Sequence, residues 1–106
     1  MQIIFKDKID TFIEREEDKD IATLMRMWLR LVEAKDWHGA GELKADFNDI
    51  GIFAGRIYLF GFLNSTYAIA TRIHFSTRQV FVLAVGKAKE VISKITSSLI
   101  PQHKFL

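Results

Sequence analysis

Two side chains in the second half of the chain, Arg72 and His74, could together act on a phosphate group. They are two residues apart in a run that alternates as a strand does, so both should point to the same face. An arginine holds phosphate oxygens through its planar guanidinium, and an imidazole moves a proton near neutral pH. Cleavage of an RNA phosphodiester needs a base to activate the 2′-hydroxyl and a cation to stabilise the crowded phosphate. The pair carries no specific motif, so polar residues on the wet face of a sheet are the simpler interpretation.

Two lysines, Lys87 and Lys89, follow the last strand-like run and flank position 88. Gly86 allows the chain to turn tightly there, which would place both lysines beside the face of Arg72 and His74. A helix N-terminus favours acidic side chains, so lysines at this place are consistent with a functional role. A solvated pair of lysines is the commoner explanation of such a pattern.

The charge of the chain divides unevenly between its two halves. Residues 1–50 hold 8 Lys/Arg against 12 Asp/Glu, a balance of −4, whereas residues 51–106 hold 7 Lys/Arg against the single acid Glu90, a balance of +6. The net charge of +2 therefore hides a strongly basic C-terminal half. Such a half predicts a polyanionic partner, RNA or DNA.

Composition limits the classes of protein that need to be considered. A chain of 106 residues, 49% of them hydrophobic, is long enough for one domain over residues 1–106 and too short for two. It has no cysteine, and its three histidines lie far apart without ligand spacing, so we expect no disulfide, no metal and no cofactor. The first residues do not resemble a signal peptide, and no apolar run is long enough to cross a bilayer. We expect a cytoplasmic protein without a membrane partner.

The first half of the chain predicts one short strand followed by helices. Residues 2–5 suit a strand, Asp7 is the expected N-cap of a first helix, and Asp20 is the expected N-cap of a second. Glu42 to Phe47 resembles one short helical turn after a loop. The second helix should bury an apolar stripe at helical spacing. Its members are Ile21, Leu24, Met25, Trp28, Leu31 and Val32.

The second half predicts three strands and a terminal helix. The strands cover residues 56–63, 67–75 and 78–85, and the short connections between them require an antiparallel meander. The helix covers residues 87–100 and ends at Pro101, which leaves 101–106 as a loose tail. We therefore predict an α+β fold of β-α-α-β-β-β-α order, with two N-terminal helices packed on an antiparallel sheet.

Alternation in the middle strand assigns its side chains to two faces. Five residues should pack on the helices: Tyr67, Ile69, Thr71, Ile73 and Phe75. The other four should form an open face that is small and basic: Ala68, Ala70, Arg72 and His74.

This order of elements, together with a set of landmark residues, resembles the HigB branch of the RelE-type toxins, small bacterial mRNA interferases of toxin–antitoxin modules. The resemblance extends from Trp28 to Lys94, about two-thirds of the chain. The landmarks are Trp28, Lys35-Asp36-Trp37, Glu42 to Phe47, Arg56 to Phe60, the strand that begins at Tyr67, Arg72-Ile73-His74-Phe75, and Val80-Phe81-Val82 before Gly86. No single landmark is diagnostic, but their order and spacing are specific together.

The resemblance implies the toxin of a type II toxin–antitoxin module, a ribosome-dependent endoribonuclease that cuts mRNA during translation. Its implied partners are a cognate helix-turn-helix antitoxin, the ribosome and mRNA, with operator DNA contacted only through the antitoxin. The basic half would seat the protein on RNA. On this hypothesis Arg56 and Arg72 bind phosphate, and His74, Lys87 or Lys89 carries the proton. Arg78 and Lys94 are further candidates for RNA contact.

The chain departs from the family pattern at three positions of its expected catalytic site. Family members commonly carry arginine where this chain has Ala68, histidine or arginine where it has Ala88, and tyrosine where it has Val91. The alanines are either natural or engineered. Three hypotheses stay open: a HigB-like mRNA endoribonuclease, either intact or in a catalytically disabled form; a catalytically silent RNA- or ribosome-binding protein on the same fold; and an interaction module whose basic face binds an acidic partner.

Overall fold

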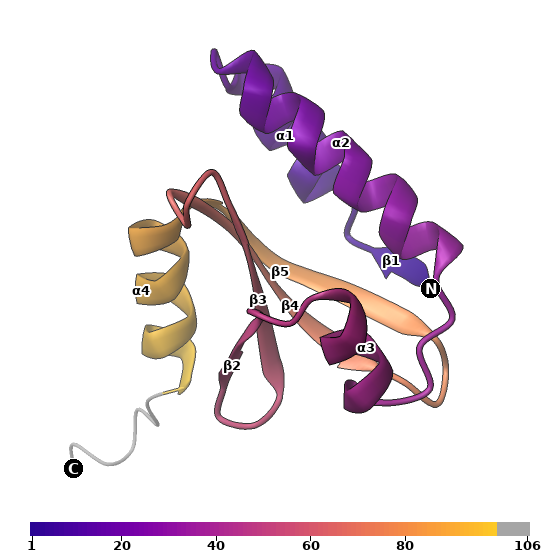
Figure 1. Cartoon of the computed structure of the whole chain (residues 1–106). Helices are drawn as coiled ribbons and strands as arrows, with labels where there is room; N and C mark the ends of the chain where they lie inside the picture. Colours follow the sequence, from indigo (N-terminus) through magenta and orange to yellow (C-terminus); the bar gives the residue numbers. More distant parts are fainter. Residues whose placement is uncertain (100–106) are drawn as a thin grey trace, which may run out of the picture.

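A five-stranded sheet forms the centre of the computed structural model, which describes residues 1–99 (Figure 1). The elements along the chain are β1 (Gln2–Ile4), α1 (Asp7–Arg15), α2 (Lys19–Ala34), α3 (Ala40–Asp46), β2 (Gly51–Phe53), β3 (Ile57–Phe62), β4 (Tyr67–His74), β5 (Gln79–Lys87) and α4 (Ala88–Leu99). Across the sheet the strands follow the order β1-β5-β4-β3-β2. The predicted α+β class is confirmed.

The sheet is mixed, so the prediction of a purely antiparallel sheet is wrong. The strands β2 to β5 pair with antiparallel neighbours, but β1 pairs with β5 in parallel. A parallel pair needs a long connection, and here three helices and three strands separate the two partners in the sequence. The sequence analysis also missed β2, a three-residue strand that a turn with positive φ at Ala54 and Gly55 joins to β3.

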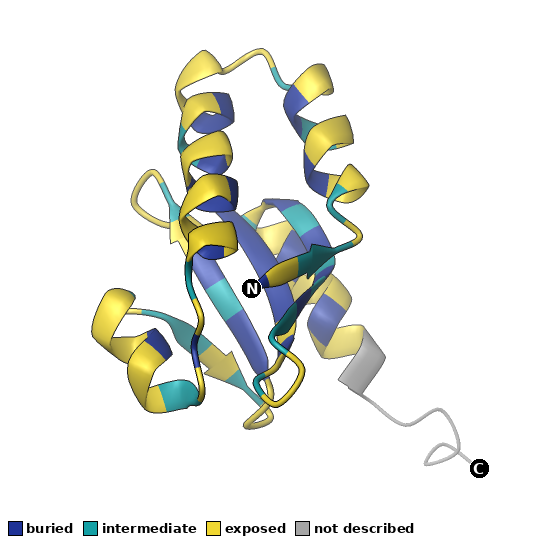
Figure 2. Ribbon diagram, turned by 90° about the vertical axis from the view of Figure 1, so that its right-hand side faces the viewer, coloured by how far each residue is buried: buried dark blue, intermediate teal, exposed yellow. Residues whose placement is uncertain are grey.

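Helices α1 and α2 pack on one face of the sheet, which we call the front face. Figure 2 shows their buried residues turned toward each other and toward the sheet. The core of this layer joins apolar residues of both helices to Ile69, Val80 and Val82 of the sheet. Four residues of the predicted α2 stripe are buried, namely Ile21, Met25, Trp28 and Val32. Leu31 is 42% exposed and Leu24 is partly exposed, because α2 turns Ala22 and Leu29 inward instead.

Both predicted N-caps are wrong by one or two residues. Lys6 precedes α1 and already has helical dihedral angles, so Asp7 lies inside the first turn. At that position the Asp7 carboxylate interacts favourably with the positive end of the helix dipole. Helix α2 is capped by Asp18 and not by Asp20: the Asp18 Oδ1 accepts from the backbone N–H groups of Asp20, at 2.9 Å, and Ile21, at 3.4 Å.

Helix α4 packs on the opposite face of the sheet, which we call the back face, and it covers only part of that face (Figure 1). Its residues Val91 and Ile95 are buried with Ala68, Ala70 and Ala84 in a second, smaller core. The prediction of one open face on β4 is therefore half wrong. Ala68 and Ala70 are 1% and 0% exposed because α4 lies over them. Arg72 and His74, farther along β4, are exposed as predicted.

The terminal helix is confirmed, although it begins at Ala88, since Lys87 still belongs to β5. The predicted helix stop at Pro101 and the tail over residues 101–106 lie outside the described residues. Within residues 1–99, no helix combines the length and apolar character that a membrane span requires.

The cap of α2 generates a stability prediction. Replacing Asp18 with alanine removes an acceptor for two backbone N–H groups, so the free energy of unfolding should fall by about 1 kcal/mol. Urea denaturation followed by circular dichroism at 222 nm measures this change. The control is Asp20→Ala, which leaves the cap in place and should cost much less. An equal or larger loss for Asp20→Ala would contradict the assignment of the cap.

Candidate functional site

The two alanines that depart from the family pattern lie on one cleft. Ala68 in β4 and Ala88 at the start of α4 are twenty residues apart in the sequence, and both line a cleft of about 420 Å³. Its described lining is Asp49, Gly51, Leu59, Gly61, Asn64, Ser65, Tyr67, Ala68, Ala88 and Ile92. The fold thus brings both positions to the same space.

Small residues surround Ala68 within the sheet. Its register partners are Gly61 on β3 and Gly86 on β5, so a row across three strands carries nothing larger than a methyl group. Gly86 has φ +150°, a region that L side chains rarely adopt. The Ala88 N–H donates to the Thr66 carbonyl at 2.9 Å and fixes the start of α4 beside the β3–β4 turn.

The charged residue in the described lining of the cleft is acidic. Among residues 1–99, Asp49 is the one charged residue in its lining. The pKa of Tyr67, another lining residue, is raised first by burial and then by the negative charges of Glu16 and Asp18, with a hydrogen bond to Glu16 also contributing. Those two acids lie in the connection between α1 and α2. A site that cleaves a phosphodiester places cations and proton carriers at the phosphate, and the described lining of this cleft supplies no lysine, arginine or histidine.

Lys87 and Lys89 lie at an adjoining depression. They line it together with Ser65, Thr66, Ala88 and Glu90, and both lysines are exposed. Ser65 and Ala88 also line the cleft, so the two hollows share a border.

Arg72 and His74 lie farther along β4, on the part of the back face that α4 leaves uncovered. Both line a shallow depression of about 260 Å³ with Phe5, Phe81 and Leu83. Ala68 and Arg72 are four positions apart on β4, which corresponds to about 13 Å along the strand. The structure therefore divides the predicted catalytic residues between two places: Ala68, Ala88, Lys87 and Lys89 at one, Arg72 and His74 at the other.

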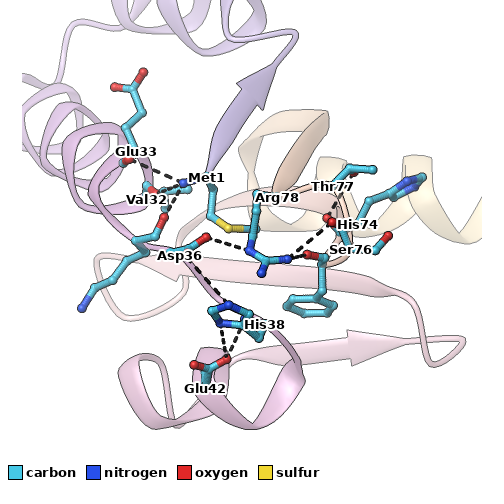
Figure 3. Close-up of polar contacts among 12 residues, drawn as sticks. Met1, Val32, Glu33, Asp36, His38, Glu42, His74, Ser76, Thr77 and Arg78 are labelled. Carbon is cyan, nitrogen blue, oxygen red and sulfur yellow. Dashed lines mark hydrogen bonds and ion pairs between the residues drawn. The ribbon is translucent and has the colours of Figure 1, made fainter.

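The predicted RNA-binding arginines and lysine differ in their surroundings. Arg56, before β3, and Lys94, on α4, are exposed. Arg78 instead ties the β4–β5 turn to the segment after α2: its Nε lies 2.7 Å from the Asp36 Oδ1, and its Nη1 donates to the Phe75 carbonyl (Figure 3). The Asp36 carboxylate also lies 3.9 Å from the His38 imidazole. Arg78 thus has a structural role that its sequence position did not reveal.

Two aromatic residues at the depression of Arg72 and His74 were not predicted from the sequence. Phe81 is the register partner of Arg72, and its ring centroid lies 4.9 Å from that of His74. Phe5 comes directly after β1, and its ring lies 6.4 Å from Phe81. Alternation along residues 78–85 could have assigned Phe81 to the back face. Nothing local could have placed Phe5 there, because that depends on β1 pairing with β5.

Comparison with protein families identifies a match over most of the chain. The model of the HigB toxin family, described as the RelE-like toxic component of a toxin–antitoxin system, matches residues 22–90. This range includes both cleft alanines and the pair Arg72 and His74. A comparison with curated proteins finds no match.

The acidic surroundings of Tyr67 generate a titration prediction. In the variant Glu16→Gln, Asp18→Asn, the pKa of Tyr67 should fall toward its ordinary value, because two negative charges that oppose the phenolate are removed. The part of the pKa increase that comes from burial of Tyr67 should remain in the variant. The asparagine retains a side-chain acceptor for the cap of α2.

The measurement is a pH titration of ¹³C-labelled tyrosine by NMR, with signals assigned by Tyr58→Phe. The control is Glu33→Gln, an exposed acid near the C-terminal end of α2, which should leave the Tyr67 titration unchanged. An unchanged pKa of Tyr67 in the double variant would contradict the assignment of Glu16 and Asp18 as a cause of the increase.

Proposed function

Because the chain belongs to the HigB family of RelE-like toxins, we propose that it is the toxin component of a toxin–antitoxin pair that acts on mRNA at the ribosome, and that its cleavage cleft is disabled. In this form it binds RNA and leaves it uncut. Its partners are a cognate antitoxin of the helix-turn-helix class, the ribosome and mRNA. Operator DNA is contacted only through the antitoxin.

The composition of the cleft supports the proposal that it is disabled. Ala68 and Ala88 both line it, and within the described part of the chain the only charge in the lining is the Asp49 carboxylate. An arginine at position 68 would face phosphate with a fixed positive charge, and a histidine at position 88 would supply a proton carrier. Both functions are absent from these two positions, and a nearby carboxylate repels phosphate. Loss of one preorganised electrostatic group typically costs a catalytic rate about 10²- to 10³-fold, so loss of two should remove detectable cleavage.

RNA binding does not depend on the cleft. The basic residues of the second half include Arg56, Arg72, Lys87, Lys89 and Lys94, all exposed. Contacts of such residues with phosphates release counterions, so the affinity for RNA should fall as salt is raised. In this assignment Arg72 contacts phosphate, and Arg78 contributes little because Asp36 neutralises it.

The geometry of Arg72 and His74 favours a second candidate function, an endoribonuclease that uses this pair in place of the cleft. Both side chains are exposed and line one depression, so a phosphate could contact the guanidinium and the imidazole together. In that case the chain as it stands would cut translated mRNA, and His74→Ala would abolish the cleavage.

Restoring the two missing groups tests the proposed function. The variant Ala68→Arg, Ala88→His should arrest bacterial growth on induction and produce new 5′ ends within translated mRNAs, whereas the unchanged chain should do neither. Growth curves and mapping of mRNA 5′ ends measure the two effects. Ala88→His alone, at a half-buried position, gives a second variant with less risk to folding and should show weaker cleavage.

The matched control adds the same groups outside the cleft. Ala45→Arg with Ala34→His changes exposed helix residues and should leave growth and mRNA intact. Growth arrest by the control variant would mean that the added side chains arrest growth wherever they are placed on the chain. Cleavage by the unchanged chain would contradict the disabled state, and its dependence on His74 would identify the second candidate function.

A further inference from the structure

Three rings lie in a row across the uncovered part of the back face. From the edge strand inward they are Phe5, Phe81 and His74, with centroid distances of 6.4 Å and 4.9 Å between neighbours. Adjacent planes are tilted by 56° and 52°, so the rings do not stack on one another. The neighbouring rings therefore do not cover one another's faces, and Phe5 and His74 are exposed while Phe81 is half-buried.

Phe5 is unusual in both its exposure and its backbone. Its side chain is 53% exposed, and its φ is +65°, a left-handed conformation that is uncommon for a bulky residue. Such conformations cost free energy and cluster at sites with a binding or catalytic role. These two features make Phe5 a candidate for contact with a ligand.

Positive charges flank the rings at both ends of the row. The Lys8 Nζ lies 5.4 Å from the centroid of the Phe5 ring and donates to the Leu83 carbonyl at 3.3 Å. At the other end Arg72, the register partner of Phe81, is exposed beside His74. None of the described residues that line this depression is acidic. We call Phe5, Lys8, Arg72, His74 and Phe81 the basic–aromatic shelf.

We propose that the basic–aromatic shelf binds single-stranded RNA, with unpaired bases stacked on Phe5 and Phe81 and the connecting phosphates held by Lys8 and Arg72. Exposed rings beside cations are the surface that single-stranded nucleic acids bind, because every base offers a face and every linkage a charge. Bases inside a duplex are already stacked, so double-stranded RNA should bind poorly here. An acidic protein partner would use the two cations and leave the rings without a role.

The inference rests on the proposed function only in taking RNA as the ligand. It needs no cleavage, because the shelf and the cleft lie at different places along β4. The shelf also gives Arg72 and His74 a binding role that differs from the catalytic role considered for them above.

The test is fluorescence anisotropy with a labelled, unstructured ten-nucleotide RNA and the full chain. Phe5→Leu should weaken binding about 5- to 150-fold, the range expected for loss of one stacked base, and Phe81→Leu should weaken it in the same direction. Phe5→Trp should retain the affinity, because the larger ring still stacks. Arg72→Ala should reduce the slope of log affinity against log salt by about one.

The control variant is Met27→Ala, which removes an exposed apolar side chain on α2, away from the shelf. It should bind RNA as the unchanged chain does. Equal affinity of Phe5→Leu, Phe81→Leu and the unchanged chain for the RNA would overturn the proposal, as would equal affinity for a duplex of the same length. Neither result touches the proposed function, whose own test is mRNA cleavage by the variant Ala68→Arg, Ala88→His.

Discussion

The close approach of α4 to the sheet is the constraint on which the rest of the back face depends. Three alanines, Ala68, Ala70 and Ala84, let the helix lie against β4 and β5 with Val91 and Ile95 buried. Full burial of each of these two larger side chains is worth about 1.5–3 kcal/mol. A bulkier residue at Ala70 or Ala84 would force the helix outward, because well-packed interiors tolerate little added volume.

Since α4 covers only part of the back face, it creates two different surfaces. At its first turn the helix closes one side of the cleft, whose described lining is mostly apolar or neutral, with one carboxylate. Beyond its cover the sheet exposes the basic–aromatic shelf, whose charged members are the cations Lys8 and Arg72. We propose that the cleft no longer cleaves RNA and that the basic–aromatic shelf binds it, so that the chain binds RNA without cutting it.

The uneven charge of the sequence corresponds to a division in the structure. The acidic half contains α1 and α2, whose connection brings Glu16 and Asp18 close to Tyr67 at the cleft. The basic half contains β2 to β5 and α4. Both kinds of charge therefore meet near the start of β4, where Lys87 is the register partner of Tyr67.

Much of the fold could be predicted because its signals are local. The strands β3 to β5 alternate clearly and are joined by turns too short for anything except antiparallel pairing. The parallel pairing of β1 with β5 could not be predicted, since no residue near positions 2–4 indicates which strand, so distant in the sequence, β1 will pair with. The cap of α2 was misplaced because Asp18 and Asp20 are equally suitable by residue type, and the cap of α1 because that helix begins after Lys6 without a side-chain cap.

Only the part of the site that depends on local sequence signals could be predicted. Alternation on β4 correctly placed Arg72 and His74 on one face, but alanine suits an open face and a helix-covered face equally well, so the cover over Ala68 and Ala70 was missed. The family resemblance identified positions 68 and 88, and only the fold could bring them to one cleft. Phe5 could not be recognised from the sequence, because its position beside Phe81 depends on the pairing of β1 with β5.

The most direct test of this account is a reconstituted translation reaction with the unchanged chain and a 5′-labelled mRNA on programmed ribosomes. Co-sedimentation reports binding, and a sequencing gel of the same sample reports cleavage. If the cleft is disabled and RNA binding is retained, the chain should sediment with the ribosomes, with an occupancy that falls as salt is raised, and the mRNA should stay full length. Cleaved mRNA, or no association with the ribosomes at low salt, would contradict it.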